Sequence, residues 1–159
     1  MRLSDLPDLL VKTAGTFFFI GYLPLAPGTF GSLAGIFLFF IFRGTGPAGY
    51  FFLFLCVTVL GFLSSGRIEK SMGKKDPGCI VIDEVSGMLL SLAFLPAQPK
   101  VVFLAFVIFR ILDTLKPFPA GRLQSLRGAA GVMADDLIAG VYCNIILQAA
   151  LKLNSSSIM

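Results

Sequence analysis

Histidine is absent from this sequence, and its absence excludes a large group of catalytic mechanisms. No imidazole is present to act as a general base, to activate a serine or cysteine nucleophile, or to bind a metal ion. Histidine-dependent lipid phosphatases are excluded for the same reason. Any chemistry must therefore rest on carboxylates, amines, guanidinium groups and hydroxyls.

Cysteine is scarce as well. Cys56, Cys79 and Cys143 are scattered and form no CxxC pair, so neither a thiolate metal site nor a redox cycle is indicated. A cysteine-dependent phosphatase would carry an arginine shortly after its nucleophile, at a spacing that none of the three shows. We expect all three to be small buried apolar residues.

Charged residues make up only 14% of the 159 residues, whereas 56% are hydrophobic, and the mean hydropathy is +0.88. A soluble domain is typically about a quarter charged. Length predicts one domain, residues 1–159, and several apolar runs approach the length that crosses a bilayer. We therefore predict an all-α fold: a polytopic transmembrane helical bundle that forms a single membrane-embedded domain.

Apolar length and chain-breaking residues predict about five membrane helices, some of them short for a bilayer. These cover residues 30–42, 50–63, 80–95, 101–115 and 132–151. The preceding stretch LPDLLVKTAGTFFFIGYLP is interrupted by Lys12 and ends near Pro24, which predicts an interfacial or re-entrant helix. Asp5, Asp8 and Lys12 interrupt the apolar core that a signal peptide needs, so we expect the N-terminal segment to be retained.

Five crossings would place the loops alternately on two sides of the membrane. One side would carry Arg67, Lys70, Lys74, Lys75, Lys116, Arg122 and Arg127, joined by Arg2 and Lys12 if the N-terminus lies there. The other side would carry only Arg43, Lys100 and Lys152. The positive-inside rule places the first set in the cytoplasm.

The same alternation gathers most of the acidic residues on the cytoplasmic side. Four motifs fall there: LAPGTFGS, DPGCIVIDE, FRILDTLKPFP and GVMADD. Six of the nine acidic residues belong to them: Asp76, Asp83, Glu84, Asp113, Asp135 and Asp136. We therefore expect the carboxylates to converge at one membrane face.

Two acidic pairs stand at the heads of apolar helices, Asp83 with Glu84 and Asp135 with Asp136. Acids at a helix N-terminus can simply cap N–H groups and complement the helix dipole. Capping explains one acid at each helix start better than it explains two. A second ionisable group inside the membrane would cost about 3 kcal/mol unless it is paired or hydrated. A functional role is favoured for both pairs.

Asp113 lies near a helix C-terminus, where the dipole disfavours negative charge. Arg110 stands three residues earlier on the same face and can pair with it. Lys116 precedes Pro117, which biases it out of helical geometry and redirects its amine. A purely structural explanation is also possible: Arg110 and Asp113 would neutralise each other, and Lys116 would extend its amine to the membrane–water interface.

A convergent group of carboxylates requires a cation. Oxygen ligands favour Mg2+ over zinc. The turn at Gly28 and Thr29 opens an apolar helix and could bind phosphate through backbone N–H groups, although such a turn is often only a tight turn. With Arg110 and Lys116 it would form an anion site beside the metal, as phosphoryl transfer requires.

These four motifs, in this order, resemble the phosphatidylglycerophosphatase A family of integral-membrane enzymes. The resemblance implies Mg2+-dependent hydrolysis of the terminal phosphate of phosphatidylglycerophosphate, giving phosphatidylglycerol and inorganic phosphate in bacterial phospholipid biosynthesis. It implies a multi-pass protein of the bacterial inner membrane whose active site faces the cytoplasm. The family positions fall on Asp83, Glu84, Asp113, Asp135 and Asp136, on Arg110 and Lys116, and on Pro27, Gly28 and Thr29.

On this basis we expect three overlapping groups of site residues. The expected metal ligands are Asp83, Glu84, Asp113 and Asp136, with Asp135 as the alternative to Asp136. The expected phosphate-binding residues are Arg110, Lys116, Gly28 and Thr29. The expected catalytic residues are Asp113, Asp135, Asp136 and Lys116. Water could attack phosphorus directly, or an aspartate could attack first and form an acyl phosphate. The sequence leaves both routes open.

Two other classes of membrane protein would also gather acidic residues. A small divalent-cation or proton-coupled membrane transporter would also use intramembrane acids, but it should show acids on both sides or an internal repeat. A phosphatidyl-group transferase should carry a glycine-aspartate-alanine-arginine signature, which is absent. Anionic phospholipid and membrane lipid are the expected partners, with no nucleic acid. The stretches SLAGIF and LIAGVY suit close helix contact within one chain or in a homo-oligomer.

Overall fold

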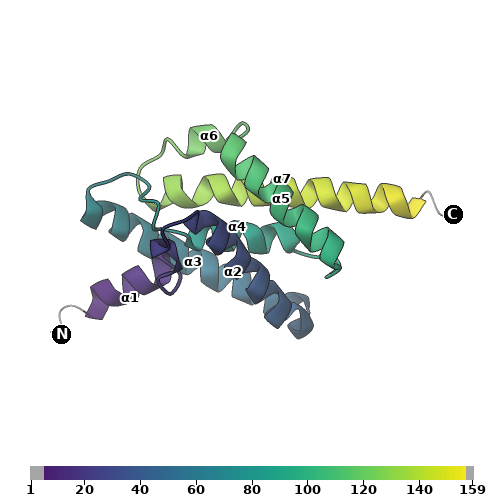
Figure 1. Ribbon diagram of the computed structural model, residues 1–159, viewed down its shortest axis with the longest axis horizontal. Helices are drawn as coiled ribbons and strands as arrows, with labels where there is room; N and C mark the ends of the chain where they lie inside the picture. Colours follow the sequence, from purple (N-terminus) through teal and green to yellow (C-terminus); the bar gives the residue numbers. More distant parts are fainter. Residues whose placement is uncertain (1–5, 157–159) are drawn as a thin grey trace.

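The computed structural model describes residues 6–156, so Arg2 and Asp5 lie outside the described part of the chain. Within that part every regular element is a helix, which confirms the all-α prediction. The elements are α1 Leu6–Gly15, η2 Ile20–Tyr22, α2 Pro27–Phe42, η3 Arg43–Thr45, α3 Gly46–Met72, α4 Ile82–Leu92, α5 Pro99–Leu115, α6 Ala120–Leu123 and α7 Ala129–Ser156 (Figure 1).

Proline and glycine set several of the helix ends. Pro27, Pro47 and Pro99 stand in the first turns of α2, α3 and α5, where a fixed φ angle favours the helix and the missing N–H costs nothing. Gly73 ends α3 in the left-handed conformation. Each of the five predicted segments overlaps one helix, whereas the short helix α6 was not predicted.

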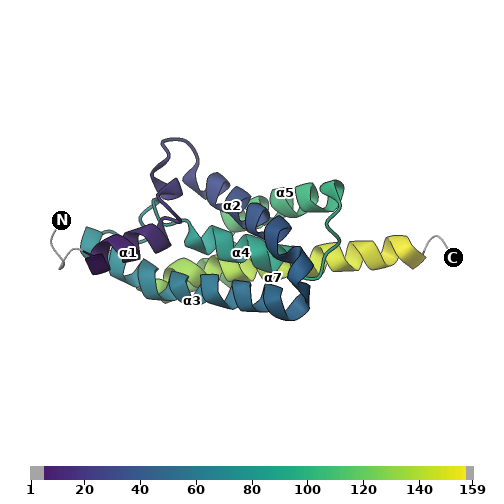
Figure 2. The same cartoon turned by 90° about the horizontal axis from the view of Figure 1, so that it is seen from below.

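Helix α4 occupies the centre of the bundle, packed against α2, α3, α5 and α7 (Figure 2). Nine of its 11 residues are buried. Eleven residues extend only about 16 Å, roughly half of the 30 Å hydrocarbon core. The other helices, rather than lipid, surround α4, so polar side chains at its start need not face hydrocarbon.

Polar contacts tie α4 to its neighbours. Asn144 on α7 donates to the carbonyl oxygens of Ser91 at 3.0 Å and Ala93 at 2.8 Å, which satisfies the C-terminal end of α4. The hydroxyl of Tyr50 on α3 donates to the carbonyl of Leu89 at 2.6 Å. Because unpaired polar groups are costly in apolar surroundings, these bonds favour one position of α4 along the bundle.

Glycines bring the backbones of α2, α4 and α7 close together. A Cβ atom on Gly140 would lie 2.6 Å from the carbonyl oxygen of Gly87, and one on Gly35 would lie 2.8 Å from Cβ of Met88. Gly35 and Gly140 belong to the stretches SLAGIF and LIAGVY, which the sequence predicts to make close helix contacts either within one chain or between the chains of a homo-oligomer. Both glycines serve contacts within the chain.

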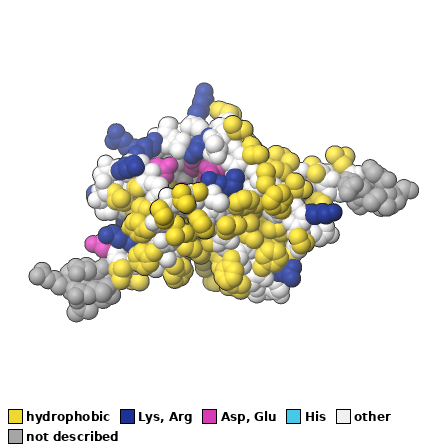
Figure 3. Space-filling view, viewed as in Figure 1, with side chains coloured by type: hydrophobic (Ala, Val, Ile, Leu, Met, Phe, Trp, Pro, Cys, Tyr) yellow, Lys and Arg dark blue, Asp and Glu magenta, His cyan; other side chains and the backbone are white. Residues whose placement is uncertain are grey.

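Large apolar side chains cover much of the outer surface (Figure 3). Examples are Phe37 at 65% exposure, Phe52 at 67% and Phe103 at 65%. Within residues 6–156, two helical stretches are long and apolar enough to cross a membrane: Pro27–Met72, which comprises α2, η3 and α3, and Ala129–Leu153 of α7. Five membrane-crossing helices are therefore not confirmed.

Replacing Gly87 with alanine should destabilise the bundle. The added Cβ would lie 2.7 Å from the carbonyl oxygen of Asp136 and 2.7 Å from the ring of Phe109, neither of which can move freely. Overpacking of this kind costs about 1–3 kcal/mol. We expect a lower thermal unfolding midpoint in detergent. Gly44→Ala is the matched control, because nothing lies within 4 Å of its added Cβ; equal midpoints for the two variants would contradict this packing.

Candidate functional site

Parts of four helices meet near one end of the bundle: the first turns of α2 and α4, the second turn of α7, which carries Asp135 and Asp136, and the last turns of α5 (Figures 1 and 2). In the space-filling view, acidic side chains lie in a hollow beside which lysine and arginine side chains project (Figure 3). This arrangement confirms that the motifs converge in space.

Three carboxylates form the centre of the site. Asp83, Glu84 and Asp136 each offer an oxygen atom, and these three atoms lie within 4.8 Å of one another. Asp83 and Asp136 are 7% and 3% exposed. Buried carboxylates this close repel one another unless protons or a cation neutralise them.

The hydrogen bonding of these carboxylates also fits a metal ion. Within the described part of the chain, Asp83 Oδ1 and Glu84 Oε2 are buried without a hydrogen-bond partner. Buried polar atoms normally have one, so unpartnered oxygens pointing into an acidic cluster indicate a ligand. Carboxylate oxygens suit hard divalent cations. Asp83, Glu84 and Asp136 could therefore hold a metal ion.

Helix geometry explains how distant acids meet. Asp83 and Glu84 lie in the first turn of α4. Gly87 follows Asp83 by one turn, and its missing side chain lets the carbonyl of Asp136 on α7 approach α4 closely. The acidic cluster therefore depends on a glycine that carries no chemistry itself.

Arg110 and Asp113 form an ion pair at 2.8 Å within the last turns of α5, as predicted. Arg110 also lies beside the start of α2, since a Cβ on Gly28 would come within 3.1 Å of its Nη1 atom and would collide with Glu84. Only glycine allows Glu84 and Arg110 to lie this close to the start of α2. The amide of Thr29 donates to the carbonyl of Ala26 at 2.9 Å, so this N–H is used within the turn.

Lys116 leaves helical geometry before Pro117, also as predicted, with φ of 46°. Its amine donates to Asp135 Oδ2 at 2.5 Å. Burial opposes the charged amine, but the bond to Asp135 and the nearby Asp113 and Asp136 raise the pKa of Lys116 overall. Lys116 is therefore a cation at neutral pH.

The predicted site residues are thus brought together, with different immediate partners. Asp136 joins Asp83 and Glu84, whereas the neighbouring Asp135 pairs with Lys116. Asp113 pairs with Arg110 and lies close enough to Glu84 and Asp136 to interact electrostatically. The grouping of three carboxylates does not include Asp113, so its metal-ligand role stays a prediction.

One contact at the rim of the site was not predicted. Gln124 Nε2, just after α6, donates to Asp76 Oδ2 at 3.4 Å. The sequence places Asp76 in an acidic motif without predicting a role for it, and no pattern in the sequence marks Gln124. The only sequence signal for this contact is the position of Asp76 in the motif DPGCIVIDE, which also contains Asp83 and Glu84.

Comparison with known proteins bears directly on this site. The family model for phosphatidylglycerophosphatase A matches residues 13–151, which include all of the residues above. The chain belongs to the phosphatidylglycerophosphatase A family. Together with the two apolar stretches, this membership indicates a membrane protein and disfavours the transporter alternative.

Individual members support the assignment. Phosphatidylglycerophosphatase A of Escherichia coli is 37% identical over 80% of this chain and 75% of its own length. The Haemophilus influenzae protein of the same name is 37% identical over 81% of each. A Bacteroides thetaiotaomicron protein, provisionally named a phosphatidylinositol-3-phosphatase, is 34% identical over 91% of this chain and 95% of its own. No solved structure matches the chain significantly.

Asp83→Asn should weaken divalent-cation binding. The substitution keeps the size of the side chain but removes one of three clustered negative charges, and affinity depends on the number of charged ligands. We expect at least a roughly 10-fold higher Kd for Mn2+, measured by electron paramagnetic resonance on the purified protein. Asp8→Asn, an exposed acid outside the cluster, is the control. Identical Kd values would argue against a metal at these residues.

Lys116→Met should lower stability, because Asp135 is only 4% exposed and would lose its partner. An unpaired buried polar group costs about 1–3 kcal/mol. The double variant Lys116→Met/Asp135→Asn should regain part of this loss, since the buried charge is gone. Unfolding in detergent is measured for Lys116→Met, for Asp135→Asn and for the double variant. If the double variant is as unstable as the sum of the two single variants, the pair contributes nothing.

Proposed function

We propose that this chain hydrolyses the terminal phosphate of phosphatidylglycerophosphate, giving phosphatidylglycerol and inorganic phosphate with Mg2+ as cofactor. One observation carries the proposal: in a chain of this family, three clustered carboxylates lie near two cationic side chains, Arg110 of α5 and Lys116 directly after it. A metal-binding set beside an anion-binding set is what hydrolysis of a phosphomonoester requires.

In the proposed reaction, Arg110 and Lys116 bind the oxygens of the terminal phosphate. The ion pairs with Asp113 and Asp135 orient these cations before the substrate arrives. Gly28 lets Glu84 and Arg110 lie close against the first turn of α2, because a Cβ at this position would collide with the Glu84 carboxylate. Mg2+, held by Asp83, Glu84 and Asp136, would neutralise charge on the phosphate and activate water.

In the overall reaction, one bond to phosphorus replaces another. A bond from phosphorus to a water oxygen forms, the bond to the glycerol oxygen breaks, and a proton passes to the departing alkoxide. Asp113, Asp135 and Asp136 are the carboxylates from which the base or nucleophile would come. An aspartyl phosphate, trapped from acid-quenched enzyme, would select the two-step route over direct attack by water.

We also propose a multi-pass topology with the site at the cytoplasmic face of a bacterial inner membrane. Cations flank the hollow, and the positive-inside rule associates such loops with the cytoplasm. An apolar groove on α5, lined by Phe106, Val107 and Ile111, adjoins Arg110, so apolar surface reaches the edge of the site. A homo-oligomer stays a prediction; the two small-residue stretches that suggested it are used within the chain.

A second candidate substrate is phosphatidylinositol 3-phosphate. It is favoured by the Bacteroides thetaiotaomicron relative, which aligns over most of both chains. Both lipids present a phosphomonoester on a hydroxylated head group, so the same carboxylates and cations would serve either one. The difference would lie in the residues that contact the head group.

Phosphate release from each lipid in detergent micelles tests the proposal. We expect release from phosphatidylglycerophosphate with Mg2+, none with excess chelator, and a loss of about 100-fold or more in Asp113→Asn. Asp8→Asn controls for a general effect of losing an acid. Faster release from phosphatidylinositol 3-phosphate would select the second substrate. No release from folded protein with any divalent metal would overturn the enzymatic proposal, and ion flux into vesicles would then test transport.

A further inference from the structure

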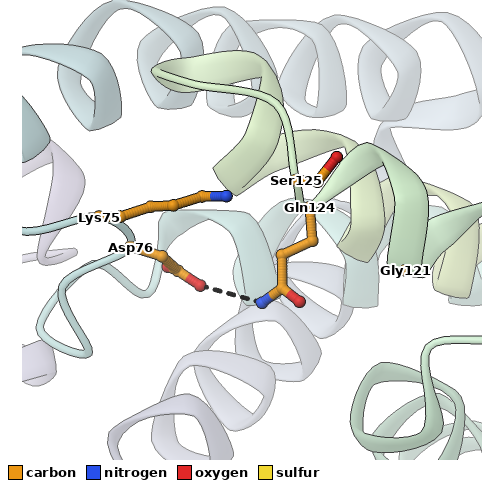
Figure 4. A pocket seen from close by; sticks show the side chains of 5 residues that line it. All are labelled: Lys75, Asp76, Gly121, Gln124 and Ser125. Carbon is orange, nitrogen blue, oxygen red and sulfur yellow. Dashed lines mark hydrogen bonds between the residues drawn. The ribbon is translucent and has the colours of Figure 1, made fainter.

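A polar pocket of about 460 Å³ opens between the loop before α4 and the segment after α6 (Figure 4). Its walls are Lys75, Asp76, Gly121, Gln124 and Ser125. The bond from Gln124 to Asp76 joins its two sides and leaves the amide oxygen of Gln124 able to accept from a ligand. None of these residues takes part in the reaction proposed above.

The pocket adjoins the phosphate-binding residues. A Cβ on Gly121 would lie 3.2 Å from the carbonyl oxygen of Lys116, so this wall of the pocket rests on the residue whose amine reaches Asp135. Asp76 lies close enough to Asp83 and Asp135 to interact with both electrostatically. A molecule whose terminal phosphate sits at Lys116 would therefore extend its next atoms toward this pocket.

Those next atoms have a definite chemistry in the proposed substrate. Beyond its terminal phosphate come a glycerol unit with a free hydroxyl and then a phosphodiester with one negative charge. The pocket offers an ammonium group from Lys75, a hydroxyl from Ser125 and an amide from Gln124, which match an anion and an alcohol. Its volume falls within the range of small-molecule sites, about 300–1,000 Å³.

The surroundings suit a lipid head group at a membrane surface. Phe118 and Leu126 flank α6 and are 71% and 45% exposed, and the guanidinium of Arg122 lies 5.0 Å from the ring centre of Phe118. Exposed apolar side chains beside cations are typical of segments that lie at an anionic lipid interface. The acyl chains attached to a head group in this pocket would thus have an apolar surface nearby.

We propose that this pocket is the head-group subsite, in which Lys75 binds the internal phosphodiester while Gln124 and Ser125 bind the glycerol hydroxyl. The inference rests on the proposed function and extends it, because these residues would decide between glycerol and a bulkier inositol head group. Asp76 is a positioning residue that holds the amide of Gln124 in place.

Binding of the soluble fragment glycerophosphoglycerol tests the subsite without requiring turnover. It carries the phosphodiester and the glycerol hydroxyls but no terminal phosphate. We expect Lys75→Ala and Gln124→Leu each to raise its Kd, measured by calorimetry on the Mg2+-loaded protein, by about 10-fold, the usual effect of losing one charged or buried hydrogen bond. Both should raise KM for phosphatidylglycerophosphate more than they lower kcat.

Lys74→Ala is the matched control, since it removes the same charge from the adjacent position, which does not line this pocket. Equal effects of Lys74→Ala and Lys75→Ala would indicate general attraction of anions and overturn the subsite. Hydrolysis with KM and Kd unchanged in Lys75→Ala and Gln124→Leu would also overturn it. Fragment binding that depends on Lys75 and Gln124 in a protein that releases no phosphate would sustain the subsite and reject the proposed reaction.

Discussion

The crowding of three carboxylates in a largely apolar bundle is the constraint on which the rest of this structure depends. Asp83, Glu84 and Asp136 place oxygens within 4.8 Å of one another, and the two aspartates are almost fully buried. Their repulsion at low dielectric opposes folding unless positive charge compensates it. The fold must therefore hold these acids together against their repulsion, and it does so by close backbone contact between α4 and α7 at Gly87 and Gly140.

The central position of α4 explains how an apolar chain tolerates such a site. This helix is too short to cross a bilayer alone, and four longer helices shield it from the outside. Protein satisfies its C-terminal end, where Asn144 donates to the carbonyl oxygens of Ser91 and Ala93, whereas its first turn places unpartnered carboxylate oxygens in the acidic cluster. Non-spanning segments are tolerated at membrane depth only where protein or a water-filled cavity surrounds them. Helix α4 fits that condition and delivers two acids to the interior end of the hollow.

Among the described residues, the two cations that form ion pairs with the site's acids come from the C-terminal end of α5. Arg110 stays on the helix and pairs with Asp113, whereas Lys116 leaves it and pairs with Asp135. A phosphate entering between them would meet cations already oriented by carboxylates, so little side-chain order would be lost on binding. Substrate recognition would continue beyond Lys116 into the pocket of Gln124 and Lys75, which separates the part of the site that acts on phosphate from the part that distinguishes head groups.

The sequence by itself determined the helical class, the approximate place of the five main helices, the acidic motifs and their meeting at one end, because these follow from local hydropathy and alternating helix direction. It also predicted the Arg110–Asp113 ion pair and the departure of Lys116 from helical geometry, because residue spacing and Pro117 act locally.

Only the tertiary structure decided that α4 is enclosed, that α3 continues to Met72, and that Gln124 meets Asp76. It likewise assigned Asp136 to the cluster and Asp135 to Lys116. Adjacent helical residues point about 100° apart, and which one faces a partner depends on the rotation of the packed helix, which no local pattern specifies.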